Sequence, residues 1–287
     1  MMPDRDCYDR LVVPTRFDGR VVLVTGSTGI AAASAQRLAA EGASVVVASR
    51  TEEHCRSLVE AITSAGGTAS YKVADLTEDG AADRIVAATV ERHGRLDGVF
   101  SVAGGSGRRF GDGPAHEATP EGWDATLDLN ARTLFLVSGA AARRMLSQDP
   151  DADGQRGAIL HMGSVTSTSP SPTYFATHAY AAAKGAIAAL TRTMASYYAP
   201  KGIRVNAVSP GVTHTPMAER AASDPEIVEF IRWKQSLVGR LLEPEDVAGA
   251  AAFLLSHDAL AITGQVLDVD AGWSLTDAPW PGPETPA

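Results

Sequence analysis

The chain has 287 residues, 45% of them hydrophobic and 21% charged, with a formal net charge of −9. This composition is ample for one large core and argues against a nucleic-acid-binding protein, which would carry a basic face. No apolar run reaches the roughly 18 residues of a membrane span. Charged residues near the start interrupt any signal-peptide core, so we expect a cytoplasmic protein without a membrane segment.

The two cysteines predict neither a disulfide nor a metal centre. Cys7 and Cys55 lack the spacing of either kind of site. No group of His, Cys, Asp and Glu has metal-ligand spacing elsewhere, so we expect no bound metal.

The first predicted unit spans residues 21–50 and combines two strands with a helix. Residues 21–24 are all aliphatic, which is typical of a parallel strand covered on both faces. A glycine turn at 25–29 leads into a helix at 30–41 that begins with small residues, and a second strand follows at 45–48. Small residues let a phosphate approach the free N–H groups of the first helical turn. The unit therefore predicts a dinucleotide site.

The end of the second strand indicates which dinucleotide binds. The acidic residue that usually binds the ribose of NAD is absent, and Ser49 and Arg50 stand in its place. A guanidinium here can pair with a 2′-phosphate, so NADP(H) is favoured, with NAD(H) possible. The alternative is a solvated Arg50 at a strand end.

Strands and helices alternate through the rest of the chain. Further strands are predicted at 68–73, 96–102, 158–162, 203–207 and 266–269, and helices at 51–65, 78–93, 119–146, 178–199 and 243–256, with another after Pro225. Residues 213–222 form a predicted loop or lid that we expect to become ordered over substrate. We divide the chain into a charged lead-in (1–17), one catalytic domain (18–274) and a proline-rich tail (275–287). The fold class expected is α/β, a Rossmann-like doubly wound sheet of parallel strands with helices on both faces.

Three side chains form a candidate catalytic group. Tyr180 and Lys184 lie one turn apart on a predicted helix, so they share a face. A free Tyr titrates near pH ~10, and a neighbouring ammonium favours the phenolate and lowers its pKa. Ser164 follows the carboxyl end of a strand, where open α/β sheets bind ligands, and its hydroxyl can donate to a substrate carbonyl. The alternatives are a surface Tyr beside a solvated Lys, and an ordinary turn Ser.

Eight short segments in a fixed order carry a family resemblance. They are VTGSTGIA (24–31), ADLT (74–77), SVAGG (101–105), LN (129–130), GSVTS (163–167), YAAAK (180–184), IRVNAVSPGVTHTPM (203–217) and VDAG (269–272). Over residues 18–273 the chain resembles the short-chain dehydrogenase/reductases of the compact, single-domain branch. The resemblance implies interconversion of a secondary alcohol and a ketone by hydride transfer, acting on a small molecule as a homodimer or homotetramer. An epimerase or dehydratase of the same superfamily, or a non-catalytic NADP-binding regulator, is the alternative.

The resemblance also implies roles for individual residues. Tyr180 would be the general acid/base, Ser164 would orient the substrate oxygen, Lys184 would bind ribose and lower the Tyr pKa, and Asn130 would hold a relay water. The implied cofactor contacts are Gly26, Ser27, Thr28, Gly29, Ile30, Ser49, Arg50, Asp75, Leu76, Ala103, Gly104, Tyr180, Lys184, Pro210, Gly211, Val212 and Thr215. Among these, Asp75 and Leu76 would meet the adenine, while 210–212 and Thr215 would position the nicotinamide amide.

The sequence departs from the family pattern at three places. Only Ser27 and Thr28 separate the first two motif glycines, Ser101 and Val102 replace a usual Asn pair, and the interval between Ser164 and Tyr180 is longer than is common.

Five other side chains carry weaker expectations. His161 is expected in the core. His178 and His214 are expected to flank the pocket, where either would touch substrate or lie on the surface. Arg108 and Arg109 would either meet an anionic substrate or be solvated.

Overall fold

A computed structural model describes residues 15–276, 280 and 282. Its strands are β1 (Val21–Thr25), β2 (Ser44–Ser49), β3 (Thr68–Val73), β4 (Gly98–Ser101), β5 (Gly157–Met162), β6 (Ile203–Pro210) and β7 (Val266–Val269). They form one sheet in the order β3-β2-β1-β4-β5-β6-β7, and every neighbouring pair is parallel. The predicted doubly wound sheet in a single domain is confirmed.

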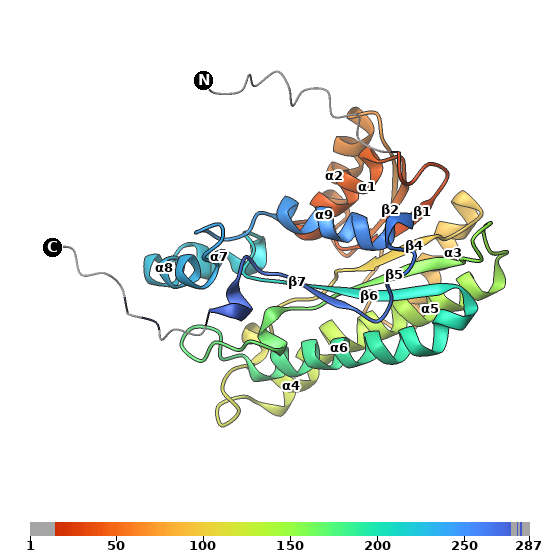
Figure 1. The fold of residues 1–287 in the computed structure, drawn as a ribbon. Coiled ribbons are helices and arrows are strands. Elements are labelled where there is room, and N and C mark those ends of the chain that lie inside the picture. Colours follow the sequence, from red (N-terminus) through yellow and green to blue (C-terminus); the bar gives the residue numbers. More distant parts are fainter. Residues whose placement is uncertain (1–14, 277–279, 281, 283–287) are drawn as a thin grey trace, which may run out of the picture.

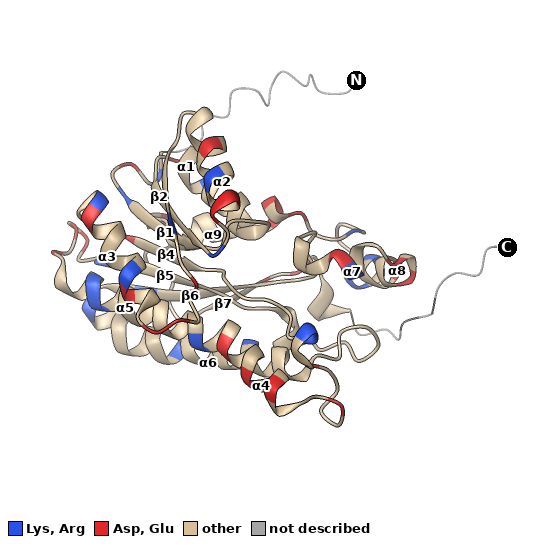
Figure 2. Ribbon diagram, turned by 180° about the vertical axis from the view of Figure 1, so that it is seen from behind, with Lys and Arg blue, Asp and Glu red and all other residues tan. Residues whose placement is uncertain are grey.

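Helices cover both faces of this sheet (Figure 1). The helices are α1 (Ile30–Ala40), α2 (Glu52–Ser64), α3 (Ala81–His93), α4 (Pro120–Leu127), α5 (Thr133–Ser147), α6 (His178–Tyr198), α7 (Glu219–Ala222), α8 (Pro225–Lys234) and α9 (Pro244–Leu255). Helices α1, α2 and α9 lie on one face, and α3, α5 and α6 on the other, while α7 and α8 stand beyond the end of the sheet. Charged residues gather on the outer helices and loops, and the central strands are almost free of them (Figure 2).

The apolar pattern of the strands explains the two layers. Successive strand residues point to opposite faces. Val22 and Val24 therefore pack toward Leu38 of α1, whereas Leu23 packs toward Ile85 of α3. A strand buried on both faces must be apolar throughout, as residues 21–24 are.

Several element bounds differ from the sequence predictions. The helix expected at 119–146 is interrupted by a π-helical turn, Asp128–Arg132, between α4 and α5. Strand β6 extends beyond the predicted 203–207 to Pro210, because residues up to Pro210 pair with β7. The expected lid at 213–222 contains a 3₁₀ turn, Pro216–Ala218, followed by α7. Its ordering over substrate stays a prediction.

The domain begins earlier than residue 18. Phe17, assigned above to the lead-in, is buried in the core and its N–H donates to the carbonyl of Glu41 at 3.0 Å. Most of the expected proline-rich tail lies outside the described residues, as does Cys7. Trp280 is described, and its ring packs 5.4 Å from that of Phe230 on α8. Cys55 is a free, buried thiol.

Candidate active site

A cavity of about 840 Å³ lies where the strands end at their carboxyl edge. The loops after β1, β2, β4, β5 and β6 all contribute to its wall. The structure thus brings together the predicted residues Gly26, Ser27, Thr28, Ile30, Ser49, Arg50, Asp75, Leu76, Ala103, Gly104, Ser164, Tyr180, Lys184, Pro210, Gly211, Val212 and Thr215. Asn130 and Gly29 are not among the lining residues, but each is next in sequence to a residue that is. The volume suits a dinucleotide and a small substrate together.

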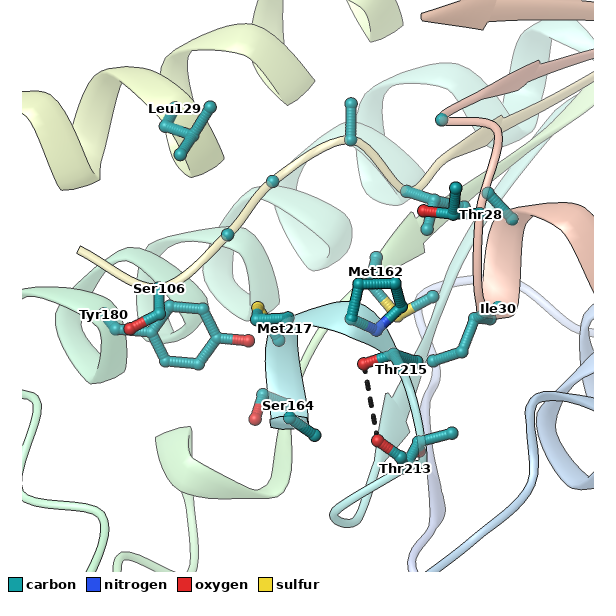
Figure 3. A pocket seen from close by; sticks show the side chains of 18 of the residues that line it. Thr28, Ile30, Ser106, Leu129, Met162, Ser164, Tyr180, Thr213, Thr215 and Met217 are labelled. Atoms are coloured by element: carbon teal, nitrogen blue, oxygen red, sulfur yellow. Dashed lines mark hydrogen bonds between the residues drawn. The ribbon is translucent and has the colours of Figure 1, made fainter. Parts of the chain in front are cut away.

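Ser164 and Tyr180 present their hydroxyl groups to the same part of the cavity. Figure 3 shows the Tyr180 ring with its oxygen turned toward the space bordered by Ser164 and Met217. Ser164 is almost buried, and its Oγ accepts from the Thr166 hydroxyl at 3.0 Å. A carbonyl oxygen placed between the two hydroxyl groups would have two donors.

Lys184 lies one helical turn beyond Tyr180 and is buried. Its Nζ donates to the carbonyl of Met162, at the end of β5, at 2.9 Å, and lies 5.4 Å from the centre of the Tyr180 ring. The hydrogen bond to Met162 fixes the ammonium near the Tyr180 ring. The remaining N–H donors of Nζ stay available for a ligand in the cavity.

Burial shifts the pKa values of both side chains. It raises the pKa of Tyr180 to about 12, although hydrogen bonding to Ser164 acts in the opposite direction. It lowers the pKa of Lys184 to about 8, because an ammonium loses hydration there. The lowered Tyr pKa expected beside an ammonium is not found in the protein without cofactor, since desolvation outweighs the hydrogen bond with Ser164. Tyr180 therefore keeps its proton at neutral pH.

Asn130 occupies the π-helical turn and is buried. Its amide Nδ2 donates to the carbonyls of Gly105 and Thr126 at 2.9 Å each, and its Oδ1 accepts from the N–H of Gly105 at 3.2 Å. The loop can approach this closely because residue 104 is glycine: a Cβ there would lie 2.6 Å from Oδ1. Backbone groups thus occupy the Asn130 side-chain amide. Its main-chain carbonyl accepts from the N–H of Thr133 and, at 3.3 Å, from the Thr133 hydroxyl, so a relay water would share this acceptor.

The turn after β1 fits the diphosphate of a nicotinamide dinucleotide. Gly29 precedes α1, no side chain caps this helix, and its first turn contains no acidic residue. Its N-terminal amides can therefore bind an anion. Gly29 has a φ of 54°, and a Cβ on it would lie 2.7 Å from the Thr215 side chain. With only two residues between the motif glycines, the turn still forms, and it packs directly against the Thr215 side chain.

The far wall of the cavity carries Arg50, after β2. Its side chain is 54% exposed, and its Nη1 lies 3.7 Å from Oδ2 of Asp75. Bonding to Thr77 and the nearby Arg50 keep the pKa of Asp75 below its usual value. His54, on the first turn of α2, lines the same wall and was missed by the sequence reasoning.

Asp112 is a second residue that the sequence reasoning missed. Its carboxylate is 6% exposed and accepts from the backbone N–H groups of Ala179 and Tyr180 at 3.0 Å each. No side chain of the preceding residues caps α6, so Asp112 supplies the cap from a distant loop. The carboxylate also complements the positive end of the helix and fixes the backbone of Tyr180.

The three histidines considered from the sequence lie outside the cavity wall. His161 is fully buried between Ser138 and Thr191, at 3.0 and 2.8 Å, and burial lowers its pKa to about 3, which confirms a neutral core residue. His178 accepts from the N–H of Ala115 at 3.0 Å. His214 is exposed and lies 3.8 Å from Glu243. The expectation that the last two could touch substrate is not supported by this placement.

Neither a metal centre nor a membrane-spanning helix is found in the described residues. Among residues 15–276, 280 and 282, no cluster of His, Cys, Asp and Glu could hold a metal ion. Over the same residues, no helix has the length and apolarity needed to cross a membrane. The cytoplasmic location stays a prediction.

Comparison with known proteins decides the family. The sequence model of a family described as enoyl-(acyl carrier protein) reductase matches residues 24–274. The short-chain reductase protein NovJ of Streptomyces niveus is 37% identical over 88% of this chain and 93% of its own length. The chain belongs to the short-chain dehydrogenase/reductase family. As a member, it is an NAD(P)-dependent oxidoreductase that interconverts alcohol and ketone groups of small molecules.

Other members are similar over nearly their whole length. An A-factor type gamma-butyrolactone 1'-reductase of Streptomyces virginiae is 37% identical over 89% of this chain and 96% of its own. 3beta-Hydroxysteroid dehydrogenase 1 of Eggerthella lenta is 37% identical over 90% and 94%. The solved structure of a short-chain type dehydrogenase/reductase from Mycobacterium ulcerans superposes with a TM-score of 0.81 at 32% identity, with 91% of each chain covered.

Proposed function

We propose that this enzyme is an NADP(H)-dependent ketone reductase in which Tyr180 supplies the proton. The observation that carries the proposal is that the Tyr180 and Ser164 hydroxyl groups face one cavity. The Lys184 ammonium lies 5.4 Å from the centre of the Tyr180 ring. The nicotinamide, when bound, supplies the hydride. Ser164 orients the substrate oxygen, Tyr180 gives it a proton, and Lys184 stabilises the phenolate that remains. The main-chain carbonyl of Asn130 holds a water that returns the proton.

The protonated state of Tyr180 favours reduction near neutral pH. A hydroxyl group whose pKa is about 12 is ready to donate, whereas alcohol oxidation needs the phenolate. Oxidation should consequently rise with pH.

A turnover screen tests the proposed function. NADPH absorbance is followed with cyclic ketones, 3-keto steroids, keto lactones, sugars and quinones; the steroids and lactones are included because relatives are named for them. Reduction of at least one ketone is expected. Tight NADPH binding without turnover of any compound would instead support a non-catalytic regulator.

Arg50 is proposed to select NADP(H) by pairing with the 2′-phosphate. A charge-assisted hydrogen bond contributes roughly 1.5–3 kcal/mol, or about 10–100-fold in affinity. Arg50→Ala should therefore weaken NADPH binding by that factor and leave NADH binding almost unchanged, as measured by fluorescence titration. Arg56→Ala is the matched control, because Arg56 lies on α2 outside the cavity wall. An unchanged NADPH-to-NADH preference in Arg50→Ala would refute the assignment.

We also propose a homodimer or homotetramer. Trp123 on α4, Phe135 on α5 and Tyr197 on α6 are large apolar side chains exposed on the same helical layer. Such side chains mark interaction surfaces when they gather on one face. Light scattering should give the mass of two or four chains, and Phe135→Glu should lower it. A monomeric wild-type enzyme would contradict the proposal.

A further inference from the structure

Two arginines from different loops meet at one backbone carbonyl beside the cavity. Nη2 of Arg108, after β4, and Nη2 of Arg220, on α7, each donate to the carbonyl oxygen of Tyr174 at 3.1 Å. The two nitrogens therefore lie no farther apart than twice that distance. Both side chains line the cavity. The loops after β4, β5 and β6 thus join at this point of the wall.

Arg108 and Arg220 are exposed residues, and the charge of the nearby Asp112 acts on Arg108 without forming an ion pair with it. Within the described part of the chain, neither guanidinium has an acidic partner at ion-pair distance, whereas Arg50, Arg132, Arg143 and Arg240 each have one. Burial and the charge of Arg220 lower the pKa of Arg108. The nearby carboxylate of Asp112 is already bonded to two backbone amides of α6.

The arginine pair has donors to spare. Each guanidinium carries five N–H donors in a planar fork, and the Tyr174 carbonyl takes one from each. Two adjacent forks suit a carboxylate, which accepts paired N–H···O bonds from guanidinium groups. Two arginines beside a ligand cavity, with no ion pair to any described acidic residue, favour the binding of an anion.

This anion does not belong to the cofactor. The uncapped amides that suit a diphosphate follow β1, and Arg50, proposed for the 2′-phosphate, follows β2. The arginine pair is held by loops after β4, β5 and β6, on the other side of β1 in the sheet. This is the side on which Ser164 and Tyr180 lie.

The neighbouring wall is aromatic. Phe175 and Trp273 line the cavity and meet edge to face, with ring centres 5.7 Å apart. The Phe175 ring, supported from behind by the fully buried Trp273, can pack against an apolar or aromatic body between the ketone and the anionic end. The wall therefore offers two hydroxyl groups that can donate hydrogen bonds, an apolar surface and a cationic end.

We propose that the substrate is a keto acid with an apolar body, whose carboxylate binds between Arg108 and Arg220 while its ketone faces Tyr180. This inference rests on the proposed ketone reduction. The carboxylate changes no bond; the carbonyl carbon receives the hydride and its oxygen receives the proton of Tyr180. The two arginines set specificity.

Matched acids and esters test the proposal. The probes are benzoylacetate, 3-benzoylpropionate and 4-benzoylbutyrate, which place the carboxylate at increasing distances from the ketone, each beside its ethyl ester. With NADPH and the wild-type enzyme, kcat/KM for at least one acid should exceed that of its ester. Arg108→Gln and Arg220→Gln should each lower this acid-to-ester ratio by about 10–100-fold, the usual effect of a lost charge-assisted bond. Arg220→Glu should lower it further.

Arg232→Gln is the matched control, since Arg232 is an exposed residue of α8 that does not line the cavity. An acid-to-ester ratio that is below one in the wild type for every pair, or unchanged in both Gln variants, would overturn the inference. If the enzyme reduces none of these ketones, a binding measurement still tests the arginine site separately from the proposed reduction. Tryptophan fluorescence of the NADP⁺ complex reports acid binding without turnover, and binding that depends on Arg108 and Arg220 would support the anion site alone. Absence of acid binding would overturn it.

Discussion

Replacing Tyr180 by Phe is expected to lower turnover by about 10²–10⁴-fold, the usual effect of losing a general acid. The substitution removes the hydroxyl group and keeps the ring and its packing. The dissociation constant of NADP(H) should change little, because the amides of α1 and the Lys184 ammonium remain in place. Steady-state kinetics beside a fluorescence titration for each variant measures both quantities.

Tyr197→Phe provides the control for this experiment. Tyr197 lies on the same helix, is 64% exposed and does not line the cavity, so losing its hydroxyl should leave turnover intact. A Tyr180→Phe enzyme with near wild-type turnover would show that another group supplies the proton. His178 and His214 are poor replacements, since neither lines the cavity.

The fold was predictable because the strand signals are local. Strands buried on both faces must be apolar, and glycines or prolines punctuate the chain between elements. Element ends were less predictable, since pairing with β7 carries β6 through Pro210 and tertiary packing creates the π turn at Asn130.

The candidate site was predictable where motif order fixed it. The residues after β1, β5 and β6 reach one cavity because parallel strands end at one edge. The cap from Asp112 was not predictable, since it joins α6 to a loop far away in sequence. Nor was the raised pKa of Tyr180, which depends on how deeply the folded protein encloses the hydroxyl group. Arg220 likewise joins Arg108 only through the Tyr174 carbonyl.

Lys184→Met is expected to damage both cofactor binding and turnover, unlike Tyr180→Phe. Methionine fills the buried space of the lysine stem but carries no charge and donates no hydrogen bond. Loss of a charge-assisted bond to the cofactor ribose should weaken NADP(H) binding by about 10–100-fold. Turnover should also fall, because no ammonium stabilises the phenolate that forms at Tyr180.

The pH dependence of ketone reduction tests whether Lys184→Met acts through the loss of the ammonium charge. Burial lowers the pKa of Lys184 to about 8, so the ammonium fraction falls as the pH rises through that value. Tyr180, with a pKa of about 12, stays protonated over the same range. Ketone reduction by the wild type should therefore decline above about pH 8, and this decline should disappear in Lys184→Met. Lys201→Met, just beyond α6, removes a charge outside the cavity and should retain the wild-type profile. A decline that persists in Lys184→Met would assign it to another group and remove Lys184 from the proposed mechanism.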